Sequence, residues 1–168
     1  MALSTAIIAV VAAISTMYLG KFSSRTIMAQ SQETDQWAFY QAKSIKAHTF
    51  SLQKERMELD MMAQGKALPV DVAQKYRDAI AGYEKTVKRY DTEKEEIKKK
   101  AEELAAQKTL SQERGGNFGY GLIFLQIAVM LSSISAITKK PPLWYLGLFS
   151  AAVGTVFALN GFYLFFKF

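Results

Sequence analysis

The sequence predicts an all-α membrane protein with three transmembrane helices and an antiparallel coiled-coil hairpin inserted between the first and the second. Three stretches, residues 1–20, 118–138 and 143–166, contain no charged side chain. All fifteen acidic residues of the 168-residue chain lie between Glu33 and Glu113. A hydrocarbon core of roughly 30 Å takes about 20 helical residues to cross, so each uncharged stretch has the length of a transmembrane helix.

The first stretch, residues 1–20, predicts a retained transmembrane helix. Its apolar run extends to about Leu19, and no basic region precedes that run as it would in a signal peptide. Residues 21–34 are polar and rich in Ser and Thr. They predict a juxtamembrane connector or a frayed helix.

Residues 35–113 predict an extramembrane helical hairpin. Thr34 is a suitable N-cap for its first helix. The turn is expected at residues 65–69, because Gly65 is a C-cap residue and Pro69 fits the first turn of the next helix. The second helix is expected to end near Glu113, with Gly115-Gly116 as a flexible hinge before the membrane.

Both helices of this hairpin show the alternating steps of three and four residues that are typical of a coiled-coil seam. The second-helix seam consists of Ala73, Tyr76, Ile80, Tyr83, Val87, Tyr90, Lys94, Ile97, Ala101 and Leu104. The first-helix seam consists of Ala38, Gln41, Ile45, His48, Leu52, Glu55, Leu59 and Met62. Folding the chain back at Ala67 is expected to place Leu59 opposite Tyr76, Leu52 opposite Tyr83 and Ile45 opposite Tyr90.

Residues 114–168 predict a transmembrane helical hairpin with helices at 118–138 and 143–166 and a tight turn at 139–142. Small residues repeat along both helices and are expected to be the helix-packing positions, because small side chains let helices approach closely in lipid. They are Gly121, Ala128, Ser132 and Ser135 in one helix and Gly147, Ala151, Gly154, Ala158 and Gly161 in the other. In the expected register Gly121 faces Gly161, Ala128 faces Gly154 and Ser135 faces Gly147.

A few polar and aromatic residues are candidates for more specific roles. Gln126 and Asn160 are amides at membrane depth, where a hydrogen bond between helices is expected and a polar lining or cofactor contact is the alternative. His48 is the single histidine, expected as a buried structural residue, with a pH-sensing contact as the alternative. Trp144-Tyr145 fits an interfacial belt, and Trp37 and Tyr40 are possible partner contacts.

The composition argues against several classes of function. The net charge of +6 does not indicate nucleic-acid binding, because eighteen basic and fifteen acidic residues are mixed along residues 21–117. The chain has no cysteine, which removes disulfides and thiolate metal sites. It shows no Ser/His/Asp set, paired catalytic carboxylates or nucleotide motif, so we expect no enzyme activity, no metal and no cofactor.

Four segments carry a resemblance to a known family. They are Asp35–Lys46 (DQWAFYQAKSIK), Ala2–Thr16, Phe124–Ala128 and Pro142–Leu148. In them the chain resembles a bacterial three-helix membrane protein family of unknown function (domain of unknown function 4337). The resemblance implies a coiled-coil insertion and brings no catalytic or binding residues. Members of the family usually have a charged N-terminal tail before the first membrane helix, and this tail suggests a cytoplasmic N-terminus.

The expected location is the bacterial inner membrane as a multi-pass protein. Lys139 and Lys140 in a short loop favour a cytoplasmic loop, in agreement with the family's tail, whereas Lys21, Arg25 and Arg114 favour the reverse orientation. The N-terminus and the 139–142 loop are therefore expected in the cytoplasm and the coiled-coil stalk in the periplasm.

The expected function is that of a structural or interaction protein. It would be a scaffold or an accessory subunit of an inner-membrane complex, assembled through small-residue helix packing and the coiled-coil stalk. Its expected partners are the lipid bilayer and either further copies of itself or other membrane-complex subunits. The alternative is a homo-oligomeric channel or membrane sensor with the two amides lining a central path.

Overall fold

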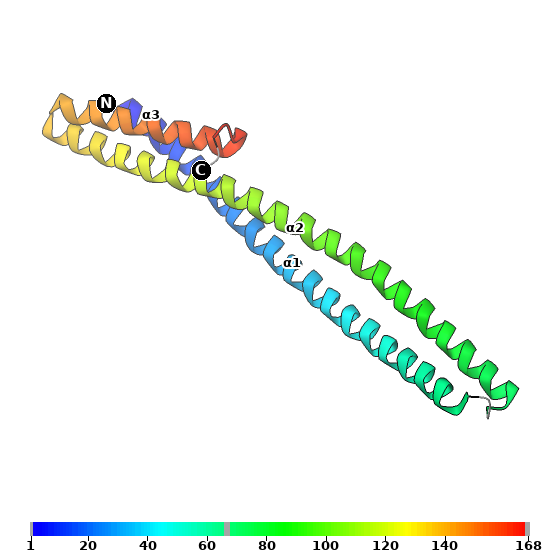
Figure 1. Ribbon diagram of the computed structural model, residues 1–168. Helices are drawn as coiled ribbons and strands as arrows, with labels where there is room; N and C mark the ends of the chain where they lie inside the picture. Colours follow the sequence, from blue (N-terminus) through cyan, green and yellow to red (C-terminus); the bar gives the residue numbers. More distant parts are fainter. Residues whose placement is uncertain (1, 66–67, 167–168) are drawn as a thin grey trace. The chain divides into compact units, whose positions relative to one another are not determined.

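The fold consists of three helices, as a computed structural model of residues 2–65 and 68–166 describes. These are α1 (Ala2–Gln64), α2 (Val70–Thr138) and α3 (Pro141–Tyr163) (Figure 1). The described residues contain no strand, so the all-α prediction is confirmed. Each helix contains a stretch that is long and apolar enough to cross a membrane.

Helix α1 ends and helix α2 begins where Gly65 and Pro69 predict. Gly65 follows the last residue of α1 and has a φ of +51°, a left-handed conformation that glycine adopts without strain. In the first turn of α2, the Ala73 N–H donates to the Pro69 carbonyl oxygen at 2.9 Å. Lys66 and Ala67, in the middle of the predicted turn 65–69, lie outside the described residues.

Two predicted interruptions are helical instead. Residues 21–34, expected as a connector or frayed helix, belong to α1 throughout. Gly115-Gly116, expected as a hinge, lies inside α2. Each glycine costs a helix about 1 kcal/mol relative to alanine, but a Cβ placed on Gly115 would lie 3.5 Å from Phe22 Cβ, in van der Waals contact. Packing against α1 therefore stabilises the helix at a sequence that would weaken it in isolation.

The connection between α2 and α3 is as short as the Lys-Pro sequence predicts. Lys139 has a φ of 52°, and Pro141 and Pro142 occupy the first two positions of α3, where a fixed φ suits a helix and no N–H is needed. Helix α3 therefore begins two residues before the predicted start at 143. It ends at Tyr163 rather than at 166, because Leu164 is left-handed and its N–H donates to the Asn160 carbonyl oxygen.

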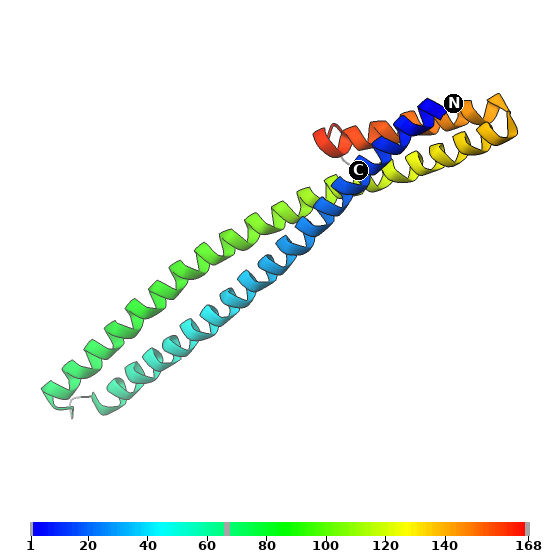
Figure 2. The same cartoon turned by 180° about the vertical axis from the view of Figure 1, so that it is seen from behind.

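The chain divides into two units that we describe separately. The three-helix unit comprises Met1–Gln30 and Ala105–Phe168, and the two-helix unit comprises Ser31–Leu104. In the three-helix unit, the first part of α1, the last part of α2 and all of α3 lie side by side in both views (Figures 1 and 2). Its core has one cluster of Ile8, Leu125, Ala128 and Ala151 and another of Phe22, Phe118 and Ala158.

The three-helix unit buries several polar residues beside its apolar core clusters and exposes many large apolar side chains. Its buried polar residues are Ser15, Asn117, Ser132, Ser135, Ser150 and Asn160. Its exposed large apolar residues include Leu3, Ile7, Met17, Met130, Ile137 and Phe149, each more than half exposed. Exposed apolar surface of this extent is unusual for a soluble domain, where large apolar side chains are exposed in small patches.

In the two-helix unit α1 and α2 pack side by side and antiparallel (Figure 2). The Lys43 ammonium forms an ion pair with the Glu93 carboxylate. The Phe50 ring lies 5.7 Å from the Tyr83 ring and 5.9 Å from the Tyr90 ring, measured between centroids. Lys43 contacts Glu93, and Phe50, further along α1, contacts Tyr83, which comes earlier in α2. The two helices are therefore antiparallel.

Candidate functional site

Small residues form the contact between α2 and α3. The nine predicted packing positions are all buried: Gly121, Ala128, Ser132, Ser135, Gly147, Ala151, Gly154, Ala158 and Gly161. A Cβ added to Gly154 would lie 2.8 Å from Leu125 Cγ and 2.9 Å from the Gly121 carbonyl oxygen. These distances are too short for any side chain, so the two backbones touch directly.

The register of this contact differs from the expected one by about one helical turn. Gly121 faces Gly154 and Ala158 rather than Gly161, and Gly147 faces Ala128 and Ser132 rather than Ser135. Gly161 instead receives the Phe118 ring, with ring atoms 2.7 Å from an added Cβ. A pattern of small residues spaced by three and four is compatible with either register. The packing of the large Phe118 ring against Gly161 selects the observed one.

Serine hydroxyls tie the two helices together inside this contact. Ser150 Oγ of α3 donates to the Phe124 carbonyl oxygen of α2 at 2.7 Å, and Ser135 Oγ donates to the Lys140 carbonyl oxygen at 2.8 Å. Sequence reasoning missed Ser150, although it precedes Ala151 in the small-residue pattern. Such bonds satisfy hydroxyls that would be costly to bury alone.

A buried pair of amides lies at the end of α3. Asn160 Nδ2 donates to Asn117 Oδ1 at 2.8 Å and to the Phe166 carbonyl oxygen at 2.9 Å. Asn160 Oδ1 accepts from the Phe166 N–H at 2.9 Å, and Asn117 Nδ2 donates to the Glu113 carbonyl oxygen at 2.8 Å. Asn160 therefore joins α3 to α2 and also holds the residues that follow α3.

The second predicted membrane amide, Gln126, lies elsewhere. Its side chain is exposed, and no hydrogen bond to it is found among residues 2–65 and 68–166. Because Gln126 is exposed and Asn160 is buried, the two amides do not line a common surface within one chain. The hydrogen-bonding partner of Asn160 is Asn117, which the sequence offered only as part of a glycine-rich segment.

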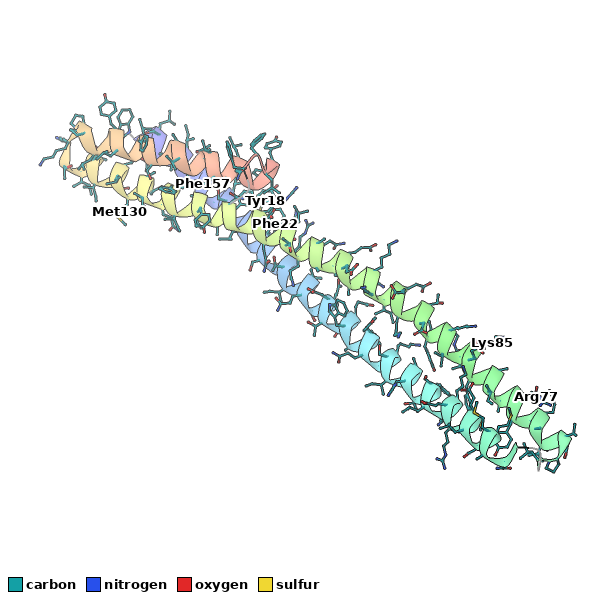
Figure 3. All side chains as sticks on the ribbon, viewed as in Figure 1. Tyr18, Phe22, Arg77, Lys85, Met130 and Phe157 are labelled. Atoms are coloured by element: carbon teal, nitrogen blue, oxygen red, sulfur yellow. The ribbon has the colours of Figure 1, made fainter. Side chains whose placement is uncertain are left out.

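Four aromatic rings gather where the uncharged stretches end. Tyr18 and Phe22 of α1, labelled in Figure 3, meet Phe118 of α2 and Phe162 of α3. The Phe22 and Phe118 rings stack at 5.8 Å, and Phe118 meets Phe162 edge to face at 4.9 Å. This cluster was not predicted, because its members are spread over three segments and no single helix shows a pattern.

Three cations surround this aromatic cluster. Arg25 Cζ lies 5.9 Å and Arg114 Cζ 5.7 Å from the centroid of the Phe22 ring, and Lys21 Nζ lies 5.5 Å from that of Tyr18. Each is within cation–π range, a contact worth about 0.5–1 kcal/mol at an exposed site. None of the three forms an ion pair among the described residues.

Of the predicted seam positions in the two-helix unit, those named on α2 are half-buried, whereas those on α1 lie on the exposed side of the helix. The named α2 positions Tyr76, Ile80, Tyr83, Val87, Tyr90 and Ile97 are half-buried. On α1, Ile45 is 67%, Leu52 51% and Leu59 59% exposed. The α1 residues that lie against α2 come about two positions earlier, among them Lys43, Ala47, Phe50 and Met57.

The error on α1 has a simple physical cause. Helix α1 carries two apolar stripes of the same period, and periodicity gives the spacing of a seam but not its rotational phase. The ring contacts of Phe50 and the ion pair of Lys43 with Glu93 select one stripe. His48, expected to be buried on the seam, is exposed with the other stripe.

The remaining aromatic candidates are placed as follows. Trp37 is 36% exposed, Tyr40 is half-buried, and their rings meet edge to face at 5.7 Å. Trp144 Nε1 donates to Ser4 Oγ at 3.1 Å, which joins the start of α3 to the start of α1. Ser4 and Tyr18 thus lie toward opposite ends of the three-helix unit.

An open groove runs between α1 and α2 within the three-helix unit. Its volume is about 470 Å³, and its lining includes Leu19, Thr26, Gly116, Gly119 and Ile123. The glycines on α2 leave this space, because they present no side chain toward it. No group of three or more His, Cys, Asp or Glu residues suited to a metal ion occurs in the part of the chain that the structure describes.

These features define an all-α protein whose three helices are each long and apolar enough to span a membrane. The chain belongs to the family described as "Domain of unknown function (DUF4337)", whose sequence model matches residues 1–164. Comparison with curated proteins and with solved structures gives no match.

Proposed function

We propose that this chain is a structural or interaction protein of the bacterial inner membrane, either a scaffold or an accessory subunit of a larger complex. The observation that supports this most directly is the apolar exterior of the three-helix unit, together with the hydroxyls and amides that are buried inside it. In lipid, an apolar exterior is solvated, and buried hydroxyls and amides hold helices together. On this proposal the two-helix unit is a coiled-coil stalk outside the bilayer.

The surface proposed for assembly is the outward stripe of α1 in the two-helix unit. Ile45, Leu52 and Leu59 follow one another at intervals of seven residues, and each is more than half exposed. A stripe with this spacing suits packing by a further helix. The small residues first considered for assembly are already occupied between α2 and α3 of the same chain, so they are not available to a partner.

The test is the mass and composition of the particle that mild detergent extracts from the native membrane. We expect more than one chain per particle, either a multiple of the 18.8 kDa chain or stoichiometric foreign subunits. Leu52→Glu, on the stripe, should reduce the particle mass. Ser51→Glu is the matched control, because Ser51 is exposed and points about 100° away around the helix.

Two results would contradict the proposal. Wild-type particles of single-chain mass would exclude a stable assembly under these conditions. Equal particle masses for the two variants would show that the outward stripe of α1 takes no part in it.

A second candidate function is a homo-oligomeric channel or membrane sensor. The exposed amide of Gln126 favours it, because an amide facing lipid is costly and gains from a polar partner on another copy. Asn160 is 2% exposed and bonded within its own chain, so it does not line such a path. Ion flux in liposomes that is unchanged by Gln126→Leu would argue against this function.

We propose that the stalk lies in the cytoplasm, the reverse of the orientation expected from the sequence. Packing of the three-helix unit groups Lys21, Arg25 and Arg114 around the cluster of Tyr18 and Phe22, while the other end carries Lys139 and Lys140. The positive-inside rule favours the more basic end as cytoplasmic. Reporter fusions at Ala67 check this, and a periplasmic signal there would restore the first orientation.

A further inference from the structure

The net charge of the protein resides in the three-helix unit. The two-helix unit contains fourteen basic and fourteen acidic residues, whereas the three-helix unit contains seven basic residues and one acidic residue, Glu113. The whole charge of +6 is therefore carried by the unit with the apolar exterior. Such a surplus points to an anionic partner for this unit.

Three of these basic residues are concentrated around two rings. Arg25 and Arg114 approach the same Phe22 ring, with Cζ atoms 5.9 Å and 5.7 Å from its centroid. Lys21 stands over the adjacent Tyr18 ring. Like charges brought together in this way repel one another, and no carboxylate forms an ion pair with any of them among the described residues.

Arg114 carries a further sign of a missing partner. Its Nε atom is buried and has no hydrogen-bond acceptor among the described residues. A buried N–H without an acceptor loses its hydrogen bond to water and gains none in return, which destabilises the folded state. An anion beside Arg114 that accepts from the guanidinium would remove both the repulsion and part of this cost.

The position of the cations indicates the source of the anion. Lys21 is the first charged residue after the uncharged stretch 1–20, and Arg114 is the last before the stretch 118–138. On the proposed membrane insertion, on which this inference rests, both lie at the level of the lipid phosphates. Met17, one helical turn before Lys21 on the same face of α1, is 62% exposed, and its apolar side chain suits contact with an acyl chain.

We propose that Lys21, Arg25 and Arg114 form a binding site for the headgroup of an anionic phospholipid. Arginine binds phosphate through several N–H donors in a fixed plane, and cation–π contacts with the Phe22 ring help to hold both guanidinium groups in place. A single acidic lipid beside this cluster neutralises part of the surplus charge. The ligand is a membrane lipid rather than free phosphate, because the apolar surface adjoins the cations.

The experiment is native mass spectrometry of the full chain in mixed micelles of phosphatidylcholine and phosphatidylglycerol. Wild-type protein should retain phosphatidylglycerol preferentially. The double variant Arg25→Gln/Arg114→Gln should lose that preference by about fivefold for each basic side chain removed. Lys139→Gln/Lys140→Gln, with the same change of charge at the other end of the unit, should retain it.

A second measurement covers the case in which the double variant fails to fold. Phosphatidylglycerol retention by the wild type should fall as salt is added, because the attraction is electrostatic. Arg114→Lys, which keeps the charge but loses the planar donor set, should show an intermediate preference. Inorganic phosphate in excess over the lipid, added at constant ionic strength, should leave the bound lipid in place.

Several outcomes overturn the site. Equal retention of the two lipids by the wild type, or an equal loss in the Lys139/Lys140 control, would show no specific site. Displacement of the lipid by inorganic phosphate would assign the cations to a free anion. Release of the chain from membranes by alkaline carbonate would instead overturn the membrane insertion, and this result is separable from the lipid measurements.

Discussion

Asn160 of α3 donates its side-chain N–H to Asn117 Oδ1 of α2 at 2.8 Å, and the two residues are 2% and 7% exposed. This hydrogen bond joins two buried side chains, whereas the bond from Ser150 Oγ joins the same two helices through the backbone carbonyl of Phe124. Polar links of this kind in membrane proteins contribute about 0.6 kcal/mol on average, with values up to about 1.7 kcal/mol.

Replacing either amide should destabilise the three-helix unit in a coupled way. We expect Asn117→Ala and Asn160→Ala each to lower the free energy of unfolding, Asn160→Ala by more because it also loses both bonds to Phe166. The double variant should fall short of the sum by about 0.6–1.7 kcal/mol. Denaturation by sodium dodecyl sulfate, followed by circular dichroism, measures these values. Gln126→Ala, at an exposed amide, is the control and should change little.

Gly154→Ala should destabilise the contact of α2 with α3. The new Cβ would stand 2.8 Å from Leu125 Cγ and 2.9 Å from the Gly121 carbonyl oxygen, and overpacking of this kind costs about 1–3 kcal/mol. Gly116→Ala is the matched control, because nothing lies within 4 Å of its added Cβ. The control should be stabilised by up to about 1 kcal/mol. Melting temperatures are measured in detergent. A lower melting temperature for Gly116→Ala than for Gly154→Ala would contradict the register of α2 against α3.

Phe50→Ala and Leu52→Ala distinguish the two faces of α1. The Phe50 ring contacts Tyr83 and Tyr90 across the helix pair, so its removal should cost about 2 kcal/mol, less than for a fully buried ring. Leu52 is 51% exposed, and within one chain its truncation should cost about 0.5 kcal/mol. The melting temperature of the two-helix unit within the full chain, in detergent that keeps single chains apart, checks this order. A larger loss for Leu52→Ala would restore the stripe first predicted.

The ion pair of Lys43 with Glu93 makes the stability of the two-helix unit depend on pH. A hydrogen bond from the Lys43 ammonium lowers the pKa of the Glu93 carboxyl. A carboxyl whose pKa is lower in the folded state stabilises that state at neutral pH, and the contribution is lost as the pH falls through its folded pKa. Glu93→Gln should therefore lower the melting temperature at neutral pH, and this effect should disappear as the pH falls through the folded pKa of Glu93.

The control for this pH dependence is Glu96→Gln. Glu96 is exposed and forms no ion pair among the described residues, so its replacement should leave the pH profile of the wild type intact. A melting temperature of Glu93→Gln that runs parallel to the wild type from neutral to acid pH would contradict the role of the ion pair.

The sequence was sufficient for the helical segments and for the two turns that separate α1, α2 and α3, but not for the continuity of α1 through residues 21–34 or of α2 through Gly115-Gly116. Gly65 and the prolines at 69, 141 and 142 stop or start helices through local backbone constraints, and such constraints act in the same way in any fold. The burial of Gly121, Gly147 and Gly154 was also predictable, because close approach of two helices in lipid requires small residues.

Rotational phase and register could not be predicted from the pattern alone. Phe50 and Leu52 both belong to apolar stripes of α1, and only the aromatic partners on α2 decide between them. Likewise, Gly154 and Gly161 are equally small, and only the seating of Phe118 places α3 against α2. The aromatic cluster of Tyr18, Phe22, Phe118 and Phe162 required residues from three helices and left no trace in local periodicity.

The equal numbers of acidic and basic residues in the two-helix unit have a kinetic consequence. A unit without net charge exerts little long-range force, and at physiological salt its local fields fade within about 8 Å. A protein that binds this unit is therefore not steered toward it from a distance, and its association rate should vary little with ionic strength. The specificity of binding to the two-helix unit therefore depends on short-range contacts between side chains, which form only after the two proteins have met.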